Sequence, residues 1–224
     1  RERIESLVDA NSFVEIGAYV KARNTDFNIQ AKDTPSDGVI TGYGVINGGL
    51  VYVYSQDASV LGGSVGEMHA KKIASLYDMA MKTGSPVIGL IDSTGLRLQE
   101  SVDGLNAFGQ IYMKQSLASG VIPTVTAIFG NCGGGLSIVA GLSDFTFMEV
   151  ENAQLFVNSP NAITENRKEI CDNASAKFQS EEAGNVDFVG TEAEVIEGIR
   201  NLVSVLPSNN EDEASDLECY DDLN

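Results

Sequence analysis

Two buried apolar runs, each followed by a glycine-bearing turn and a helical pattern, constrain the fold of this chain more than any other feature. They are PVIGLIDSTGLRLQE, residues 86–100, and IPTVTAIFGNCGGGLS, residues 122–137. Short continuous apolar runs bounded by turn residues are typical of strands that are buried on both faces of a sheet. Strand and helix alternate through this region, which predicts an α/β fold with a largely parallel sheet and right-handed crossovers.

The segments before and between these runs extend the pattern. A short amphipathic helix opens the chain, and two β-rich runs around Asn47 and Gly48 predict a type I′ hairpin. The sheet is therefore expected to begin with an antiparallel edge. Apolar residues at helical spacing predict long helices over residues 67–84 and 98–120.

The last third of the chain is less regular. Residues 144–160 predict one or two further strands, and the polar stretch after them contains a helix predicted near residues 163–171. Order returns at the final helix, where Thr191 and Glu194 have the spacing of a capping box.

The chain is expected to form one folded domain over residues 1–206. Pro207 follows the last helical pattern, and the acidic residues 207–224 are expected to form a tail or an interdomain linker. The sequence shows neither a run of about 20 apolar residues nor the apolar core of a signal peptide, so we expect no direct membrane span and a cytoplasmic location. The formal net charge of -18 argues against nucleic acid or an anionic membrane surface as the main partner.

The turn GNCGGGLS places three consecutive glycines where a helix is expected to begin. In an open parallel sheet the ligand crevice lies at the carboxyl ends of the strands, so both glycine turns can line one site. A helix beginning at Gly134 would direct free N–H groups and the positive end of its dipole into that crevice. The residues alone leave open a phosphate site, an oxyanion site or tight helix packing. A Walker-type loop is disfavoured because no GK[ST] follows.

Other residues near these turns have both a chemical and a structural interpretation. Gly62 and Gly63 lie in a third strand-to-helix crossing, which can bind phosphate or simply connect tightly packed elements. His69, the only histidine, can be a general base, but packing or a surface position is favoured. Cys132 is interpreted as a small buried thiol, because no partner histidine for a nucleophile is evident. The cysteines have no CxxC spacing, so neither a disulfide framework nor a metal site is predicted.

Several long motifs in the same order make the chain similar to a known family. The resemblance is to the N-terminal half of the carboxyltransferase component of biotin-dependent acyl-CoA carboxylases and decarboxylases. It is carried by DGVITGYGVINGGLVYVYSQDASVLGGSVGEMHAKKI, MKTGSPVIGLIDSTGLRLQE, LASGVIPTVTAIFGNCGGGLSIVAGLSDFTFM and LPSNNEDE. The resemblance implies a crotonase-like fold, a ββα superhelix, with this chain as a single N-terminal carboxyltransferase domain.

The resemblance also implies the chemistry of the site. Carboxyl transfer to or from the α-carbon of an acyl-CoA passes through a thioester enolate, whose oxygen is stabilised by backbone N–H groups placed in advance. One donor comes from each glycine turn, so the implied catalytic residues are Gly95 or Leu96 and Gly134 or Gly135. The residues implied to bind the CoA thioester or the cofactor are Gly62, Gly63, Thr94, Arg97 and Gly133. Biotin on a separate carrier protein is the implied cofactor.

The resemblance implies partners and leaves alternatives. The partners are a C-terminal carboxyltransferase half or subunit, a biotin carboxyl carrier protein, a biotin carboxylase and further copies of the chain. One alternative is the α subunit of a biotin-dependent glutaconyl-CoA or methylmalonyl-CoA decarboxylase. Another is a non-catalytic acyl-CoA-binding assembly subunit.

The chain departs from the family pattern in two places. Thr94 and Leu96 are bulkier than usual in the first turn, which is expected to narrow or reshape the acyl pocket. After Pro160 a stretch without histidine replaces the family's histidine-bearing stretch, so its contacts are not carried over. We expect valine at Gly134 or Gly135 to abolish function and to leave the fold substantially intact.

Overall fold

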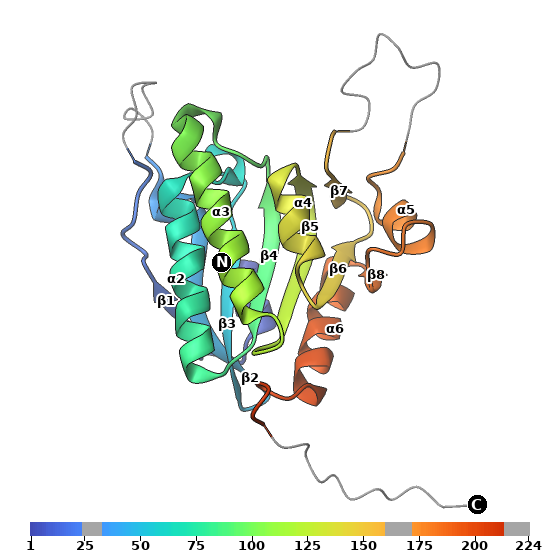
Figure 1. Cartoon of the computed structure of the whole chain (residues 1–224). Coiled ribbons are helices and arrows are strands. Elements are labelled where there is room, and N and C mark those ends of the chain that lie inside the picture. Colours follow the sequence, from blue (N-terminus) through green and yellow to red (C-terminus); the bar gives the residue numbers. More distant parts are fainter. Residues whose placement is uncertain (24–32, 160–171, 213–224) are drawn as a thin grey trace, which may run out of the picture.

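The computed structural model describes residues 1–23, 33–159 and 172–212, which fold around one mixed β-sheet (Figure 1). Within these residues eight strands form the sheet in the order β1-β2-β3-β4-β5-β6-β8, and β7 pairs with β5. Helices lie on both faces of the sheet. This arrangement confirms the α/β fold class that the alternating pattern predicts.

The antiparallel edge of the sheet depends on a two-residue turn. β2 (Val39–Ile46) and β3 (Gly49–Gln56) pair along their full lengths. Asn47 and Gly48 between them have φ values of 50° and 88°, as a type I′ turn requires, so the predicted hairpin is confirmed. β1 (Val14–Ile16) pairs antiparallel with the outer side of β2.

The remaining strands run parallel. β4 (Val87–Ser93) lies between β3 and β5 (Thr124–Gly133). β6 (Phe145–Glu149) and β8 (Phe188–Gly190) extend the sheet on the far side of β5. β7 (Gln154–Phe156) pairs with the last three residues of β5, so that strand continues into the glycine turn.

Two sets of helices cover the sheet (Figure 1). On one face lie α2 (Glu67–Thr83), α3 (Ser101–Ala118) and α4 (Gly135–Gly141). The other face is covered by α1 (Glu2–Leu7) and α6 (Glu192–Val205).

Strand β4 shows why its sequence is apolar throughout. Val87 and Ile91 belong to the core under α2 and α3, whereas Ile88 and Leu90 belong to the core under α1 and α6. Successive side chains of a strand point to opposite faces, so a strand covered on both sides buries all of them.

Short elements connect and complete the sheet. The 3₁₀ turns are η2 (Pro35–Gly38), η3 (Leu61–Gly63) and η4 (Leu98–Glu100). The two-turn helix α5 (Ala176–Glu181) lies beside β7 and β8.

The long predicted elements are confirmed and the short ones were harder to predict. The N-terminal helix, both long helices and the capped final helix all form. The helix predicted at residues 163–171 lies outside the described residues, and neither α5 nor β8 was predicted. Beyond Leu206 the chain still contacts the domain, because the Asn209 amide and the Asn210 N–H donate to the carbonyls of Gly84 and Val121, both at 3.0 Å.

The capping box of α6 yields a test of local stability. The Thr191 N–H donates to Glu194 Oε2 at 2.8 Å, and the Glu194 N–H donates to Thr191 Oγ1 at 3.4 Å. We expect Thr191→Ala to lower the free energy of unfolding by about 1 kcal/mol, because a helix N–H loses its acceptor. Urea unfolding would measure the loss. Ser204→Ala, at an exposed position near the other end of α6, should be nearly neutral, and an equal loss in both variants would contradict the capping role.

Candidate functional site

The two glycine turns meet at the carboxyl ends of β4 and β5. Ser93 at the end of β4 pairs with Cys132 near the end of β5. Beyond this pair, a Cβ placed on Gly95 would lie 3.4 Å from the Gly133 carbonyl oxygen. Parallel pairing has therefore brought the turns close together, which is consistent with the prediction that both can line one site.

Of the two candidate N–H groups in the first turn, the one at Gly95 is bound within the fold and the one at Leu96 has no acceptor among the described residues. The Gly95 N–H donates to Ser93 Oγ at 3.1 Å. Val65 bridges the residues on either side of Leu96: its N–H donates to the Gly95 carbonyl at 2.8 Å, and its carbonyl accepts from the Arg97 N–H at 2.9 Å. In such a bridge the N–H of the middle residue points to the opposite side. No described residue accepts a hydrogen bond from the Leu96 N–H.

The second turn repeats this arrangement. The Gly134 N–H donates to the Phe156 carbonyl of β7 at 3.0 Å, while its own carbonyl accepts from the Ser137 N–H and Oγ–H at 3.1 and 2.7 Å. Gly135 is the first residue of α4, and its N–H has no acceptor among the described residues. Both glycine turns therefore hold one candidate N–H in the fold and leave one available, at Leu96 and at Gly135.

Gly135 is crowded on its side-chain side. The Tyr112 hydroxyl donates to the Gly135 carbonyl at 2.7 Å. A Cβ on Gly135 would lie 2.7 Å from the Tyr112 hydroxyl oxygen and 3.1 Å from the Phe108 ring. Valine at Gly135 would collide with α3, so it would disturb packing as well as any donor role. A Cβ on Gly134, in contrast, would meet no described atom within 4 Å, although the φ of +60° favours glycine.

The third glycine-rich crossing supports the first turn. The Gly62 carbonyl accepts from the Thr94 N–H at 2.9 Å, and the Gly63 carbonyl accepts from Ser93 Oγ at 2.7 Å. A side chain on Gly63 would collide with the main chain at Asp92. These glycines thus allow close approach of two backbones.

Thr94 and Leu96, the two bulkier residues of the first turn, face different surroundings. Thr94 is exposed, whereas the Leu96 side chain packs against α3, where a Cβ on Gly104 would lie 2.8 Å from Leu96 Cδ1. Gly133 is packed too, because a Cβ there would lie 2.5 Å from the Phe156 ring.

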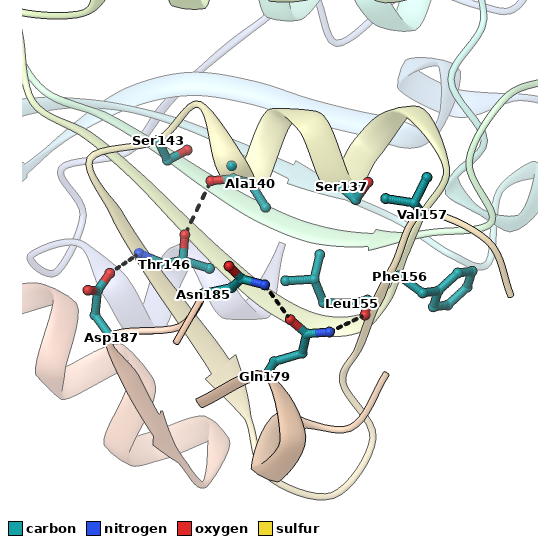
Figure 2. Close-up of a pocket in the computed structure, with 11 residues that line it drawn as sticks. Ser137, Ala140, Ser143, Thr146, Leu155, Phe156, Val157, Gln179, Asn185 and Asp187 are labelled. Atoms are coloured by element: carbon teal, nitrogen blue, oxygen red, sulfur yellow. Dashed lines mark hydrogen bonds between the residues drawn. The ribbon is translucent and has the colours of Figure 1, made fainter. Parts of the chain in front are cut away.

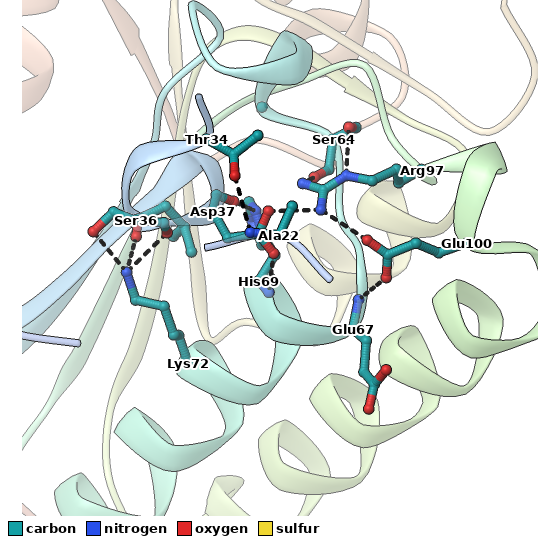
Figure 3. Close-up of polar contacts among 12 residues, drawn as sticks. Ala22, Thr34, Ser36, Asp37, Ser64, Glu67, His69, Lys72, Arg97 and Glu100 are labelled. Carbon is teal, nitrogen blue, oxygen red and sulfur yellow. Dashed lines mark hydrogen bonds and ion pairs between the residues drawn. The ribbon is translucent and has the colours of Figure 1, made fainter. Parts of the chain in front are cut away.

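A buried ionic cluster stands directly behind the first turn (Figure 3). Arg97 is 1% exposed, and its Nη1 lies 2.6 Å from Asp37 Oδ1 and 2.9 Å from Glu100 Oε1. Burial raises the pKa of the Asp37 carboxyl above its usual value, and the neighbouring Arg97 charge opposes that shift. The guanidinium is therefore occupied by protein groups and lies inside the fold.

Sequence reasoning did not identify Asp37 and Glu100. Their carboxylates accept from main-chain N–H groups at the start of α2, those of His69 and Glu67. The available signal was weak: α2 begins after Gly66, which has no side chain to cap the helix. A missing cap indicates that another segment supplies the acceptors, but it does not say which.

His69 is a buried structural residue, so of the two positions favoured from the sequence, packing or surface, the structure shows packing. Its Nδ1 lies 2.9 Å from the Asp37 carbonyl and its Nε2 lies 3.2 Å from the Gln56 amide nitrogen. These partners assign the proton to Nδ1, because a carbonyl accepts and an amide N–H donates. Burial, with the nearby Arg97 charge, lowers the pKa of His69 to about 3. A buried neutral imidazole held on both sides does not fit a general base.

Cys132 is likewise part of the core. It is 0% exposed, and burial raises the pKa of its thiol to about 12. The thiolate that a nucleophile requires is therefore disfavoured. The interpretation of Cys132 as a buried thiol is confirmed.

A cavity of about 410 Å³ borders the second turn on the flank of α4 that faces β7 and α5 (Figure 2). Ser137 and Phe156 line it, and no residue of the first turn does. Its amide side chains bond to protein groups: Asn185 Nδ2 donates to Gln179 Oε1 at 2.9 Å, and Gln179 Nε2 donates to the Leu155 carbonyl at 3.1 Å. The cavity therefore borders one turn and is not shared by the two.

The described residues hold neither a metal site nor a membrane-spanning helix. No group of three or more His, Cys, Asp or Glu side chains in residues 1–23, 33–159 and 172–212 is arranged to hold a metal ion. No helix in the same ranges has the length and apolar character to cross a membrane.

Comparison with known proteins identifies the chain's relatives. Residues 1–224 match the carboxyl transferase domain family. The chain is 43% identical to the methylmalonyl-CoA decarboxylase subunit alpha of Propionigenium modestum and 40% identical to the propionyl-CoA carboxylase beta chain of Roseobacter denitrificans. These matches cover 100% and 99% of this chain but 44% of each relative, so the chain spans less than half of their length.

A solved structure agrees with these matches. The transcarboxylase 12S structure with hydrolysed methylmalonyl-coenzyme A bound is 36% identical to the chain, with a TM-score of 0.92. The similarity covers 99% of this chain and 44% of that one, and that protein is described as a hexameric multienzyme core.

The state of Cys132 can be tested by alkylation. At about pH 8 a thiol with so high a pKa and no exposed surface should resist iodoacetamide in the native protein and react after denaturation. Peptide mass spectrometry would follow Cys132 separately from Cys171 and Cys219. Rapid native labelling of Cys132 would show a reactive thiol and would contradict the packing role.

His69 gives a pH dependence of stability with a defined sign. Its folded pKa of about 3 lies below the ordinary value of 6.5, so acid protonates the unfolded state first. Stability from this group is complete above the unfolded pKa and is lost as the pH falls from 6.5 towards 3. Between about pH 7.5 and 5.5 the free energy of unfolding should fall by about 1.4 kcal/mol from His69 alone.

Replacing His69 should remove this dependence. Denaturant unfolding of His69→Gln should show lower stability at neutral pH but little further loss between the two pH values. An unchanged slope would mean that other groups cause the acid sensitivity.

Proposed function

The chain belongs to the carboxyl transferase domain family of biotin-dependent acyl-CoA carboxylases and decarboxylases, and from this premise we propose that its crotonase-like domain binds a short acyl-CoA and stabilises its thioester enolate. In this proposal a carboxyl group moves between biotin and the α-carbon of the acyl group. The chain supplies the thioester side of the site.

The observation that carries the proposal is the pair of N–H groups, at Leu96 and Gly135, for which no described residue supplies an acceptor. Breaking the bond from the α-carbon to its carboxyl group, or removing a proton from the α-carbon before a carboxyl group is added, leaves an enolate with negative charge on the thioester oxygen. Two fixed N–H donors aimed at one oxygen stabilise that charge without reorganisation, and each such donor is worth about 3 kcal/mol of transition-state stabilisation. Gly95 and Gly134 fit this role less well than Leu96 and Gly135, because their N–H groups already donate to Ser93 Oγ and the Phe156 carbonyl.

The helix behind Gly135 supports the same use. Gly135 is the first residue of α4, where free N–H groups and the positive end of the helix dipole favour negative charge. The substrate oxygen would then accept from the Leu96 N–H on one side and the Gly135 N–H on the other. The closeness of the two turns, where a Cβ on Gly95 would lie 3.4 Å from the Gly133 carbonyl oxygen, supports the assignment of both donors to one site.

The named relatives favour a three-carbon acyl group. Propionyl-CoA and methylmalonyl-CoA appear in the names of the relatives and of the similar structure, and these thioesters differ by one carboxyl group on the α-carbon. We propose this pair as the substrates. Exposed Thr94 is better placed than Leu96, whose side chain packs against α3, to shape the acyl pocket.

The chain's own residues hold the thioester and do not supply a nucleophile. His69 and Cys132 are both buried. At neutral pH the His69 imidazole is neutral and the Cys132 thiol is protonated. Biotin on a carrier protein supplies the chemistry of holding and releasing the carboxyl group. Its contacts are assigned to a C-terminal carboxyltransferase half, because this chain covers 44% of its relatives. A biotin carboxylase and further copies of the chain are the other proposed partners.

The direction of transfer has two candidates. A propionyl-CoA carboxylase beta chain and a methylmalonyl-CoA decarboxylase alpha subunit are both similar to the chain, at 40% and 43% identity. Enolate stabilisation serves both directions, because they share the same transition state. Supply of carboxylated biotin by a biotin carboxylase would give carboxylation, and removal of the carboxyl group by a decarboxylase subunit would give decarboxylation.

The proposal is tested by carboxyl exchange in the complete carboxyltransferase that contains this chain. Labelled methylmalonyl-CoA should pass its carboxyl group to a biotinylated carrier and leave propionyl-CoA. A carrier without biotin is the control. Thioester binding without transfer from malonyl-, methylmalonyl- or glutaconyl-CoA would instead favour a non-catalytic binding subunit. The absence of both binding and transfer would contradict the proposal.

The second turn can be tested by a matched pair of glycine substitutions. Gly134→Ala meets no described atom within 4 Å but strains a φ of +60°, so it should shift the Gly135 N–H while leaving packing space unchanged. We expect kcat for carboxyl transfer to fall by about 100-fold, as when one oxyanion donor is lost.

Gly120→Ala is the control for backbone strain. Gly120 also has a positive φ, +74°, and open space around its Cβ, but it lies in the turn after α3. Gly120→Ala should lower the free energy of unfolding by an amount similar to Gly134→Ala and leave kcat unchanged. Equal kcat in Gly134→Ala and Gly120→Ala would remove the donor role from the second turn.

A further inference from the structure

Arg97 connects the first turn to two other segments of the chain. Its Nε donates to Ser64 Oγ at 3.2 Å and its Nη2 donates to the Ser64 carbonyl at 2.6 Å. Its Nη1 donates to Asp37 and Glu100. All three nitrogens of the guanidinium are therefore bound, from three directions, and the group has one position.

The two carboxylates that hold Arg97 are themselves fixed by α2. Glu100 Oε2 accepts from the Glu67 N–H at 2.6 Å, and Asp37 Oδ2 accepts from the His69 N–H at 2.8 Å (Figure 3). Because these N–H groups belong to the first turn of a 17-residue helix, the anchors of Arg97 are tied to a rigid element. The carboxylates also lie at the positive end of the helix dipole.

The main chain transmits this position to Leu96. The Arg97 N–H donates to the Val65 carbonyl, and Leu96 is the preceding residue. The guanidinium is tightly packed, since a Cβ on Gly66 would lie 2.6 Å from Arg97 Nη1. A shift of the guanidinium would therefore displace the main chain at Arg97 and reorient the N–H of the preceding residue, Leu96.

We propose that Arg97, anchored by Asp37 and Glu100, is a positioning residue that sets the direction of the Leu96 N–H toward the substrate oxygen. This inference rests on the proposed function, because it assigns a purpose to the same donor. Arg97 does not touch the substrate in this proposal; it acts through the main chain. The inference thereby replaces the direct binding role that the family resemblance implies for Arg97.

The test separates a positioning role of the cluster from a role in stability alone. Arg200 provides a matched control on the other face of the sheet. Its Nη1 donates to the Leu7 carbonyl at 2.6 Å and its Nη2 lies 2.7 Å from Asp9 Oδ1, so it also links an acidic side chain and a main-chain carbonyl. Lysine at either position keeps the charge and loses the planar fork.

The experiment compares Arg97→Lys with Arg200→Lys in the complete carboxyltransferase. We expect Arg97→Lys to lower kcat for carboxyl transfer by about 10- to 100-fold with KM within about threefold, because misplacing one donor affects the transition state most. Arg200→Lys should lose stability without a change in kcat. Ser64→Ala, which removes one bond and keeps both carboxylates, should fold even if Arg97→Lys does not, and should lower kcat about threefold to tenfold.

Hydrogen exchange gives a readout that does not depend on turnover. Exchange in a peptide covering residues 93–97 should be faster in Arg97→Lys and in Ser64→Ala, and unchanged in Arg200→Lys. If the unaltered enzyme transfers no carboxyl group, the proposed function fails, whereas the exchange data still decide whether Arg97 holds the turn. Unchanged exchange at residues 93–97, or equal kcat in the Arg97 and Arg200 variants, would overturn the positioning role.

Discussion

The parallel pairing of β4 with β5 is the constraint on which the rest of the site depends. It aligns Ser93 with Cys132 and so places the two following turns at one edge of the sheet. The donors proposed for the thioester oxygen are 39 positions apart in the sequence, at Leu96 and Gly135. Neither turn could form the site alone, because two converging donors need two strands that end together.

The hydrogen bonds of the fold then distinguish the glycines from their neighbours as donors. The buried Gly95 N–H finds an acceptor in Ser93, and the N–H of the more exposed Gly134 donates to Phe156 of β7. Strand β7 thus shapes the second turn, since its Phe156 carbonyl occupies the Gly134 N–H. The groups that remain are available for a ligand because the fold has satisfied the ones beside them.

The sequence predicted what local patterns determine and failed where distant segments decide. The Asn47–Gly48 hairpin, the Thr191 cap and the contact between the glycine turns follow from turn chemistry and strand direction. The choice of Leu96 over Gly95 as the donor does not follow from local patterns, because it depends on the Ser93 hydroxyl and on Val65. Asp37 and Glu100 were missed for the same reason, since their partners in α2 are 30 or more residues away. The short elements α5 and β8 have too few residues to show a period.

Gly66 explains why an arginine with two carboxylates occupies the centre of the fold. A Cβ at this position would collide with Arg97 and Glu100, so the close approach of the first turn to α2 requires glycine. Glycine, however, has no side chain to cap α2, and the N–H groups at the start of that helix would be left without acceptors. Asp37 and Glu100 supply those acceptors from outside the helix, and Arg97 offsets their charge. An apolar replacement of the cluster would leave the helix N–H groups unsatisfied, so the tight packing that positions the turn also makes a buried charge necessary.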